Sequence, residues 1–140
     1  MKKSILSLSL ITVAIITSSS SCKPDKECED AGTGGNLTVV ATLKHHSKVI
    51  YNQPNYLDTV FVKFNTQDLP GTEPLDFDTY FVGEAGEDHV HLDGLKCGDY
   101  YIYGAAFDTT ITQRVVGGIP FSTTQTDGEI ELIVPVTEGD

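Results

Sequence analysis

The sequence predicts an all-β protein, folded as a Greek-key sandwich of seven to eight strands. Three observations support this fold class. Apolar and polar residues alternate in short segments, with the two-residue period of a half-buried strand. Turn signals rich in Gly, Pro, Asn and Asp separate these segments, and no window has the spacing of an amphipathic helix. The 140 residues suffice for one such domain.

Composition and charge narrow the possible functions. The chain is 39% hydrophobic and 21% charged, which is typical of a globular protein. Its formal net charge is −11. Nucleic-acid binding and electrostatic docking on anionic lipid head groups both need clustered Lys and Arg, so we expect neither.

Residues 1–21 have the pattern of a secretory signal peptide. Lys2 and Lys3 precede an apolar stretch over residues 5–17, which is shorter than the ~20 residues that a membrane-spanning helix needs. A run of small residues, 18–21, then leads directly to Cys22. This pattern predicts export and cleavage close to Cys22.

The segment before Cys22 resembles the cleavage site of bacterial lipoproteins, in the Ser-rich version found in the Bacteroidetes. Ser19 stands where the family usually has Leu or Val. The resemblance implies that Cys22 becomes the lipid-carrying N-terminus, with palmitate among its acyl chains. It places the domain in the cell envelope, anchored to the outer membrane on its periplasmic or surface face. The alternative is a soluble secreted protein, cleaved within the serine run.

The remaining cysteines suggest a disulfide. If Cys22 carries lipid, Cys28 and Cys97 are left, and an oxidising compartment favours their pairing. The alternative is two free thiols, because spacing alone does not establish geometry. Residues 22–35 are charged and Gly-rich without an apolar period, so we expect a flexible tether there. The β-sandwich domain then covers residues 36–138.

Eight segments carry the strand pattern, in this order: residues 37–43, 60–65, 80–82, 90–92, 100–107, 111–116, 121–124 and 130–136. The last is the clearest, because its alternation is the most regular. Turn signals between segments include Asn52-Gln-Pro-Asn55, Asp93-Gly94 and Gly117-Gly118. The connection over residues 65–77 is long for a sandwich, so we expect a recognition surface there.

A local motif sharpens the fold prediction. Leu95, Gly98 and Tyr100 form the sequence Leu-x-x-Gly-x-Tyr, which is typical of a tyrosine corner. We expect Leu95 to fill the core and Gly98 to permit a sharp entry into the strand. The Tyr100 hydroxyl is expected to cap a backbone group a few residues upstream.

With Gly94, this motif resembles the Gly-Leu-x-x-Gly-x-Tyr segment of prealbumin-like (transthyretin-like) and carboxypeptidase-regulatory-like sandwiches. Residues 22–138 are also similar to a group of small Bacteroidetes lipoproteins, through segments such as 86–91 and 117–120. These resemblances imply an immunoglobulin-like or transthyretin-like sandwich. They also imply an accessory, adhesive or carbohydrate-associated module rather than a catalyst.

The four histidines are the candidate metal ligands: His45, His46, His89 and His91. His89 and His91 are two apart on a predicted strand and share its outer face. The parity of the first strand places His45 inward and His46 outward. If the two strands are neighbours, His46 completes a three-imidazole patch suited to Zn(II) or Cu(II), with Asp88 as ligand or supporting partner. The alternative is ordinary hydrogen-bonded histidines, with His45 closing the core.

Neighbouring carboxylates are a further candidate for chemistry: Asp76 with Asp78, and Glu84 with Glu87 and Asp88. Such pairs serve glycosidases and calcium sites. The sequence has no calcium-loop spacing and no nucleophile motif. A solvated acidic rim is therefore favoured, and no enzymatic activity is expected.

The aromatic segment offers two interpretations. Tyr101, Tyr103 and Phe107 share one face of the predicted strand over residues 100–107. They form either an exposed stacking strip for a sugar or peptide, or a layer packed under a covering loop.

Taken together, the sequence predicts a lipid-anchored, non-catalytic module of the cell envelope with a binding or structural role and no required cofactor. Its expected partners are the membrane, through the lipid, and an envelope protein or glycan. The alternative is a lipoprotein that binds Zn or Cu through its histidine cluster.

Overall fold

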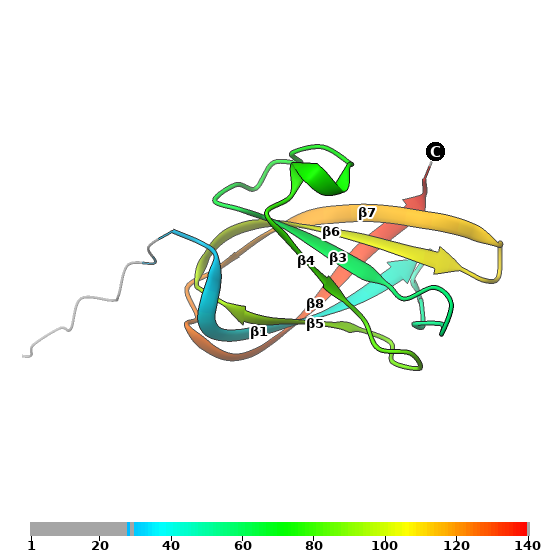
Figure 1. Cartoon of the computed structure of the whole chain (residues 1–140), viewed down its shortest axis with the longest axis horizontal. Coiled ribbons are helices and arrows are strands. Elements are labelled where there is room, and N and C mark those ends of the chain that lie inside the picture. Colours follow the sequence, from blue (N-terminus) through cyan, green and yellow to red (C-terminus); the bar gives the residue numbers. More distant parts are fainter. Residues whose placement is uncertain (1–27, 29, 140) are drawn as a thin grey trace, which may run out of the picture.

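The computed structural model describes residue 28 and residues 30–139. This part of the chain is almost entirely β, which confirms the predicted fold class (Figure 1). Eight strands and one turn of 3-10 helix follow one another: β1 (Thr33–His45), β2 (Lys48–Val49), β3 (Thr59–Phe64), η1 (Pro74–Asp76), β4 (Thr79–Val82), β5 (Val90–Leu95), β6 (Gly98–Asp108), β7 (Gln113–Thr123) and β8 (Asp127–Glu138).

The expected signal peptide, the lipidation site Cys22 and most of the expected tether lie outside the described residues. Within them, no helix has the length and apolar character needed to cross a membrane. β1 begins at Thr33 and Ala31 is buried, so the domain starts earlier than residue 36.

The strands form one mixed, curled sheet that folds into two layers (Figure 1). β5, β1 and most of β8 make one layer, and β7, β6, β3 and β4 make the other. β1 and β8 run parallel along most of their length, with Asn36 opposite Asp127. The end of β8 pairs antiparallel with β7, where Glu138 lies opposite Val115. β8 therefore joins the two layers.

The core lies between the layers and follows the predicted alternation. In β1, every second residue from Leu37 to Leu43 is fully buried, while the residues between them are partly exposed. β6 contributes Tyr100 and Ile102 from its inner face. This alternation leaves the outer faces of both layers available for polar and functional side chains.

The tyrosine corner and the disulfide form as expected. Leu95 is fully buried, and the Tyr100 hydroxyl donates to the carbonyl of Lys96 at 2.6 Å. A Cβ on Gly98 would lie 2.7 Å from the Cβ of Ala31, so the chain entry requires glycine. Cys28 and Cys97 form a disulfide with a Cα–Cα distance of 5.5 Å, which ties the start of the domain to the β5–β6 turn.

The prediction of a turn at Gly117-Gly118 was wrong, because both residues lie within the continuous strand β7. The two glycines instead permit close backbone approach. A Cβ on Gly117 would lie 2.4 Å from the carbonyl oxygen of Pro135, and one on Gly118 would lie 2.5 Å from that of Ile102. The reversal falls at residues 109–112, so Ile111 is in the turn rather than in a strand.

The expected turn at Asp93-Gly94 is a bulge within β5. Leu92 lies opposite Val39 and Leu95 lies opposite Leu37, so β5 carries one extra residue here. Gly94 has a φ of 74°, the left-handed conformation that glycine adopts without strain.

Candidate metal centre

The structure separates the four histidines into two groups. Val40 lies opposite His91, so β5 pairs with the middle of β1. His46 follows the end of β1, in a turn with a φ of 47°. The expected patch of His46, His89 and His91 is therefore not formed. The parity predictions are confirmed, because His45 is 3% exposed while the His46 side chain is 73% exposed.

The first group links the ends of three strands. The Nδ1 atom of His45 lies 2.8 Å from a carboxylate oxygen of Asp108, and its Nε2 atom lies 3.4 Å from one of Glu138. The hydrogen bond to Asp108 raises the pKa of His45. Hydrogen bonds from the Thr110 hydroxyl and from His45 lower the pKa of Asp108 to about 2.

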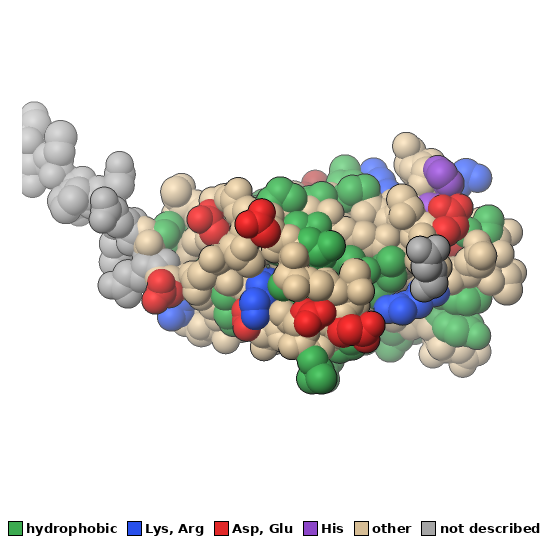
Figure 2. Space-filling view, turned by 90° about the horizontal axis from the view of Figure 1, so that it is seen from above, with side chains coloured by type: hydrophobic (Ala, Val, Ile, Leu, Met, Phe, Trp, Pro, Cys, Tyr) green, Lys and Arg blue, Asp and Glu red, His purple; other side chains and the backbone are tan. Residues whose placement is uncertain are grey.

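This first group behaves as an ion-pair network. The ligand atoms of His45, His46 and Glu138 lie within 4.8 Å of one another. However, two carboxylates favour the protonated His45, which offers no lone pair to a metal. His45 thus closes the core and connects β1 to β6 and β8. This agrees with the alternative given for the histidines above, in which His45 is a hydrogen-bonded residue that closes the core. Figure 2 shows histidine beside acidic side chains at one end of the molecule.

The second group consists of Glu87, His89 and His91. The Nε2 atoms of His89 and His91 lie 3.0 Å apart, and the Nε2 atom of His89 is 3.6 Å from Oε2 of Glu87. All three ligand atoms lie within 4.8 Å of one another. Zn–N bonds of about 2.0–2.1 Å in a tetrahedral site place two ligand nitrogens about 3.3 Å apart. The two imidazoles are therefore already spaced to share one ion.

Hydrogen bonding determines which nitrogen of His89 is available. Its Nδ1 atom lies 2.7 Å from a carboxylate oxygen of Asp88, which only accepts hydrogen bonds when ionised. The Nδ1 atom therefore carries the proton, and a neutral His89 has its lone pair on Nε2. This carboxylate–histidine arrangement is the one that supports histidine ligands in metal sites. The contact with His89 also lowers the pKa of Asp88.

The metal-free contact between the two imidazoles follows from this tautomer. The Nε2–H group of His91 donates to the Nε2 lone pair of His89. A divalent cation would take the place of that single proton, provided that His91 changes to the Nδ1–H tautomer. The exposed position of His91 on the outer face of β5 permits this exchange with solvent.

A buried asparagine holds the segment that carries these ligands. The backbone N–H of Asn52 donates to the carbonyl of Glu87 at 2.8 Å, and its Nδ2 atom donates to the carbonyl of His89 at 3.1 Å. The N–H of Gly86 donates to the carbonyl of Asn52 at 2.8 Å. A Cβ on Gly83 would lie 2.2 Å from Oδ1 of Asn52, so the close fit requires glycine. The ligands are thus positioned by the fold rather than by their own flexible loop.

The histidine pair stands at the rim of a shallow hollow of about 570 Å³. The hollow lies over the outer face of β1, between β5 and β8, and Lys44 is its only basic lining residue besides the histidines. Its acidic lining residues are Asp88, Glu129 and Glu131. This balance of charge favours the approach of a cation.

The other predicted carboxylates have structural contacts. Asp76 accepts the N–H of Glu73 at 2.9 Å, which closes the 3-10 turn. Asp78 pairs with Lys63 at 3.0 Å. Glu84 takes part through its backbone rather than its carboxylate, since its carbonyl accepts the N–H of Glu87. Of the acidic residues expected to matter, Glu87 and Asp88 therefore belong to the histidine group.

The structure agrees with the covering-loop interpretation for one residue of the aromatic segment, Tyr103. Tyr103 is only 5% exposed, and Phe77 from the 65–77 connection stacks on it with a centroid distance of 5.4 Å. Tyr101 and Phe107 remain partly exposed. The long connection thus covers Tyr103 in the middle of the aromatic strip and leaves Tyr101 and Phe107 partly exposed on either side.

Comparisons with protein-family models, with curated proteins and with solved structures found no match to this chain. The class of protein is therefore defined here by its fold and its site: an all-β sandwich that carries a surface histidine–carboxylate group. The resemblances to lipoproteins and to prealbumin-like domains stay predictions.

Proposed function

We propose that this protein is a lipid-anchored, non-catalytic binding module of the cell envelope whose ligand is a divalent transition metal. Glu87, His89 and His91 would supply the ligand atoms, and Asp88 would orient His89. The 3.0 Å separation of the two Nε2 atoms carries the proposal, because it is close to the ligand spacing of a shared ion.

The donor set favours Zn(II) or Cu(II). Two imidazoles and one carboxylate suit these borderline ions better than Ca²⁺ or Mg²⁺, which prefer all-oxygen sites. Three protein ligands leave one position of a tetrahedral Zn(II) open. Because the group is at the surface, that position is accessible to water or to a donor from an envelope partner. Such a site suits reversible binding or transfer of the metal.

The proposal is tested by zinc competition with a chromophoric chelator, using the purified protein. We expect one Zn(II) per chain and at least tenfold weaker binding in His91→Ala. His46→Ala is the matched control, since it removes an exposed histidine outside the group and should bind zinc normally. Unaltered binding in His91→Ala would refute the proposal, and so would loss of binding in His46→Ala alone.

Thermal unfolding gives a second readout of the same site. A ligand that binds only the folded state raises the melting temperature in proportion to RT ln(1 + [L]/Kd). At equal zinc concentration, the melting temperature should therefore rise similarly in the wild type and in His46→Ala, and clearly less in His91→Ala.

The anchor needs a separate experiment, because it depends on residues 1–22 alone. Labelled palmitate should enter the full-length protein when it is expressed in a lipoprotein-processing bacterium. Cys22→Ser should abolish the label. Absence of label in the unaltered protein would refute the anchor and would leave the metal site untouched.

A further inference from the structure

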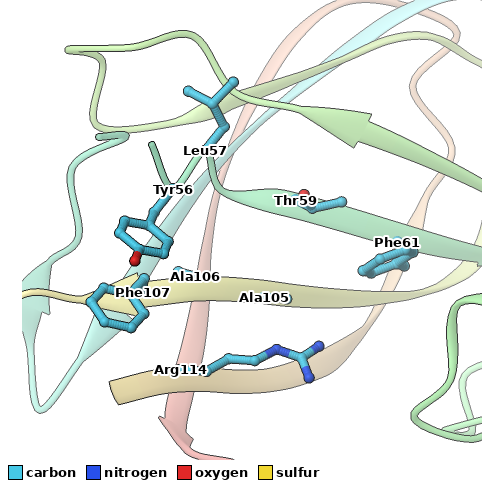
Figure 3. Close-up of a pocket in the computed structure, with 8 residues that line it drawn as sticks. All are labelled: Tyr56, Leu57, Thr59, Phe61, Ala105, Ala106, Phe107 and Arg114. Atoms are coloured by element: carbon cyan, nitrogen blue, oxygen red, sulfur yellow. The ribbon is translucent and has the colours of Figure 1, made fainter. Parts of the chain in front are cut away.

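A second candidate site lies on the outer face of the other layer. A groove of about 330 Å³ opens between the loop before β3 and strands β3, β6 and β7 (Figure 3). Its walls are largely apolar: Tyr56, Leu57, Phe61 and Phe107 are among its lining residues. One charged side chain, that of Arg114, lines it as well.

The sheet register explains why this face is hollowed. Ala105 lies opposite Thr59, and these small side chains form the floor. On one side, Phe61 lies opposite Tyr103, and on the other, Phe107 lies opposite Arg114. A row of small residues thus lies between two rows of large ones.

The aromatic wall is held in place by its own packing. The rings of Tyr56 and Phe107 stack with a centroid distance of 4.2 Å and an interplanar angle of 14°. On the far side, Phe61 packs against Phe77 at a centroid distance of 5.5 Å. The walls are therefore preformed, as in most small-molecule sites.

Arg114 supplies the polar contact of the groove. It is the only arginine of a chain with a net charge of −11. In Figure 3 its side chain extends along the groove, with the guanidinium between Phe107 and Phe61. Among the described residues, no carboxylate lies within 4.0 Å of this guanidinium. Lys63 on the same face, by contrast, has Asp78 as an ion-pair partner at 3.0 Å.

We propose that this groove binds a small carboxylate with an aromatic or branched apolar body. A guanidinium matches the two oxygens of a carboxylate through paired N–H donors, which gives both charge and orientation. The apolar walls would take the body of the ligand, whose size fits a cavity of about 330 Å³. A neutral ligand would use the walls but would leave the guanidinium without a partner.

The proposal is tested on the metal-free protein by NMR titration with 3-phenylpropionate, with 3-phenylpropionamide as its neutral counterpart. We expect the carboxylate to shift the amide signals of β3, β6 and β7 around the groove. The neutral amide should bind at least tenfold more weakly, because a charge-assisted hydrogen bond is lost.

Two pairs of variants locate the site. Arg114→Met should weaken carboxylate binding at least tenfold, whereas Lys44→Met, which removes a cation from the opposite layer, should not. Ala105→Leu should fill the floor and abolish binding, whereas Ala105→Ser should retain it. The second pair keeps the test valid if Arg114→Met fails to fold.

Three results would overturn the proposal. These are no shifts at the groove, equal binding of the acid and the amide, and unchanged binding in both Arg114→Met and Ala105→Leu. The outcome is independent of the metal proposal, since no metal is present and no metal ligand is changed.

Discussion

Asp58 is a buried carboxylate whose replacement by Asn should stabilise the protein at high pH. Its side chain precedes β3 and is 1% exposed, and neither carboxylate oxygen has a hydrogen-bond partner among the described residues. Burial raises the pKa of Asp58 from 3.8 to about 7. A charged Asp58 is therefore costly to the folded state.

The sign and size of the effect follow from proton linkage. Between pH 3.8 and about 7, the folded state binds more protons at Asp58 than the unfolded state does. Stability therefore falls as pH rises through this window. A difference of about three pKa units corresponds to a loss of about 4 kcal/mol above pH 7, which is an upper bound because local relaxation admits water. A side-chain amide at this position does not titrate, so Asp58→Asn should avoid this loss.

Urea unfolding at pH 4, 6 and 8 measures the effect. The free energies of unfolding of wild type and Asp58→Asn should be similar at pH 4 and should diverge at pH 8, with the variant more stable by up to about 4 kcal/mol. Asp68→Asn, at an exposed position, is the control and should show no such divergence. A difference between wild type and Asp58→Asn that stays constant with pH would refute the reasoning.

Two further predictions concern the tyrosine corner and the disulfide, which both stabilise the fold. Tyr100→Phe should lower the free energy of unfolding by about 1–3 kcal/mol, because the buried N–H of Gly32 loses its hydroxyl partner. Tyr101→Phe is the control. An equal loss of stability in both variants would contradict the stabilising role of the tyrosine corner. Reducing the Cys28–Cys97 disulfide, which spans 69 residues, should cost about 4 kcal/mol in the chain-entropy model; an unchanged urea midpoint after reduction would count against this.

Local features of the fold could be predicted because their causes lie within a few residues. The alternation in β1 places Leu37 in the core whatever strand lies beside it. The tyrosine corner is equally local, since the Tyr100 hydroxyl reaches back only four residues to Lys96. By contrast, Gly117-Gly118 carries the composition of a turn. Its actual role is to let Pro135 of β8 and Ile102 of β6 approach, which depends on contacts distant in sequence.

The candidate site, like the fold, was predictable only where its causes lie close together in the sequence. The spacing of two residues between His89 and His91 is visible in the sequence, and the structure brings their Nε2 atoms within 3.0 Å, although only His91 lies in β5 and His89 directly precedes it. The exclusion of His46 depends on the register between β5 and β1, which sequence does not show. Asn52 gave only a turn signal, although it positions the whole ligand segment. Glu138 gave no signal, because its contact with His45 exists only once β8 lies parallel to β1.

Each of the two proposed sites includes outward-facing residues of a strand whose inward-facing residues form the core. His91 alternates with the fully buried Val90 and Leu92 in β5, and Ala105 alternates with the buried Ala106 in β6. Substitutions at these outer positions therefore remove ligand contacts without opening a cavity in the core. Because the sites lie on opposite layers and share no residue, their effects on binding should be additive. The double variant His91→Ala/Ala105→Leu should lose zinc binding to the same extent as His91→Ala, and carboxylate binding to the same extent as Ala105→Leu. A change in carboxylate affinity when zinc is added to the wild type would show instead that the two layers are coupled.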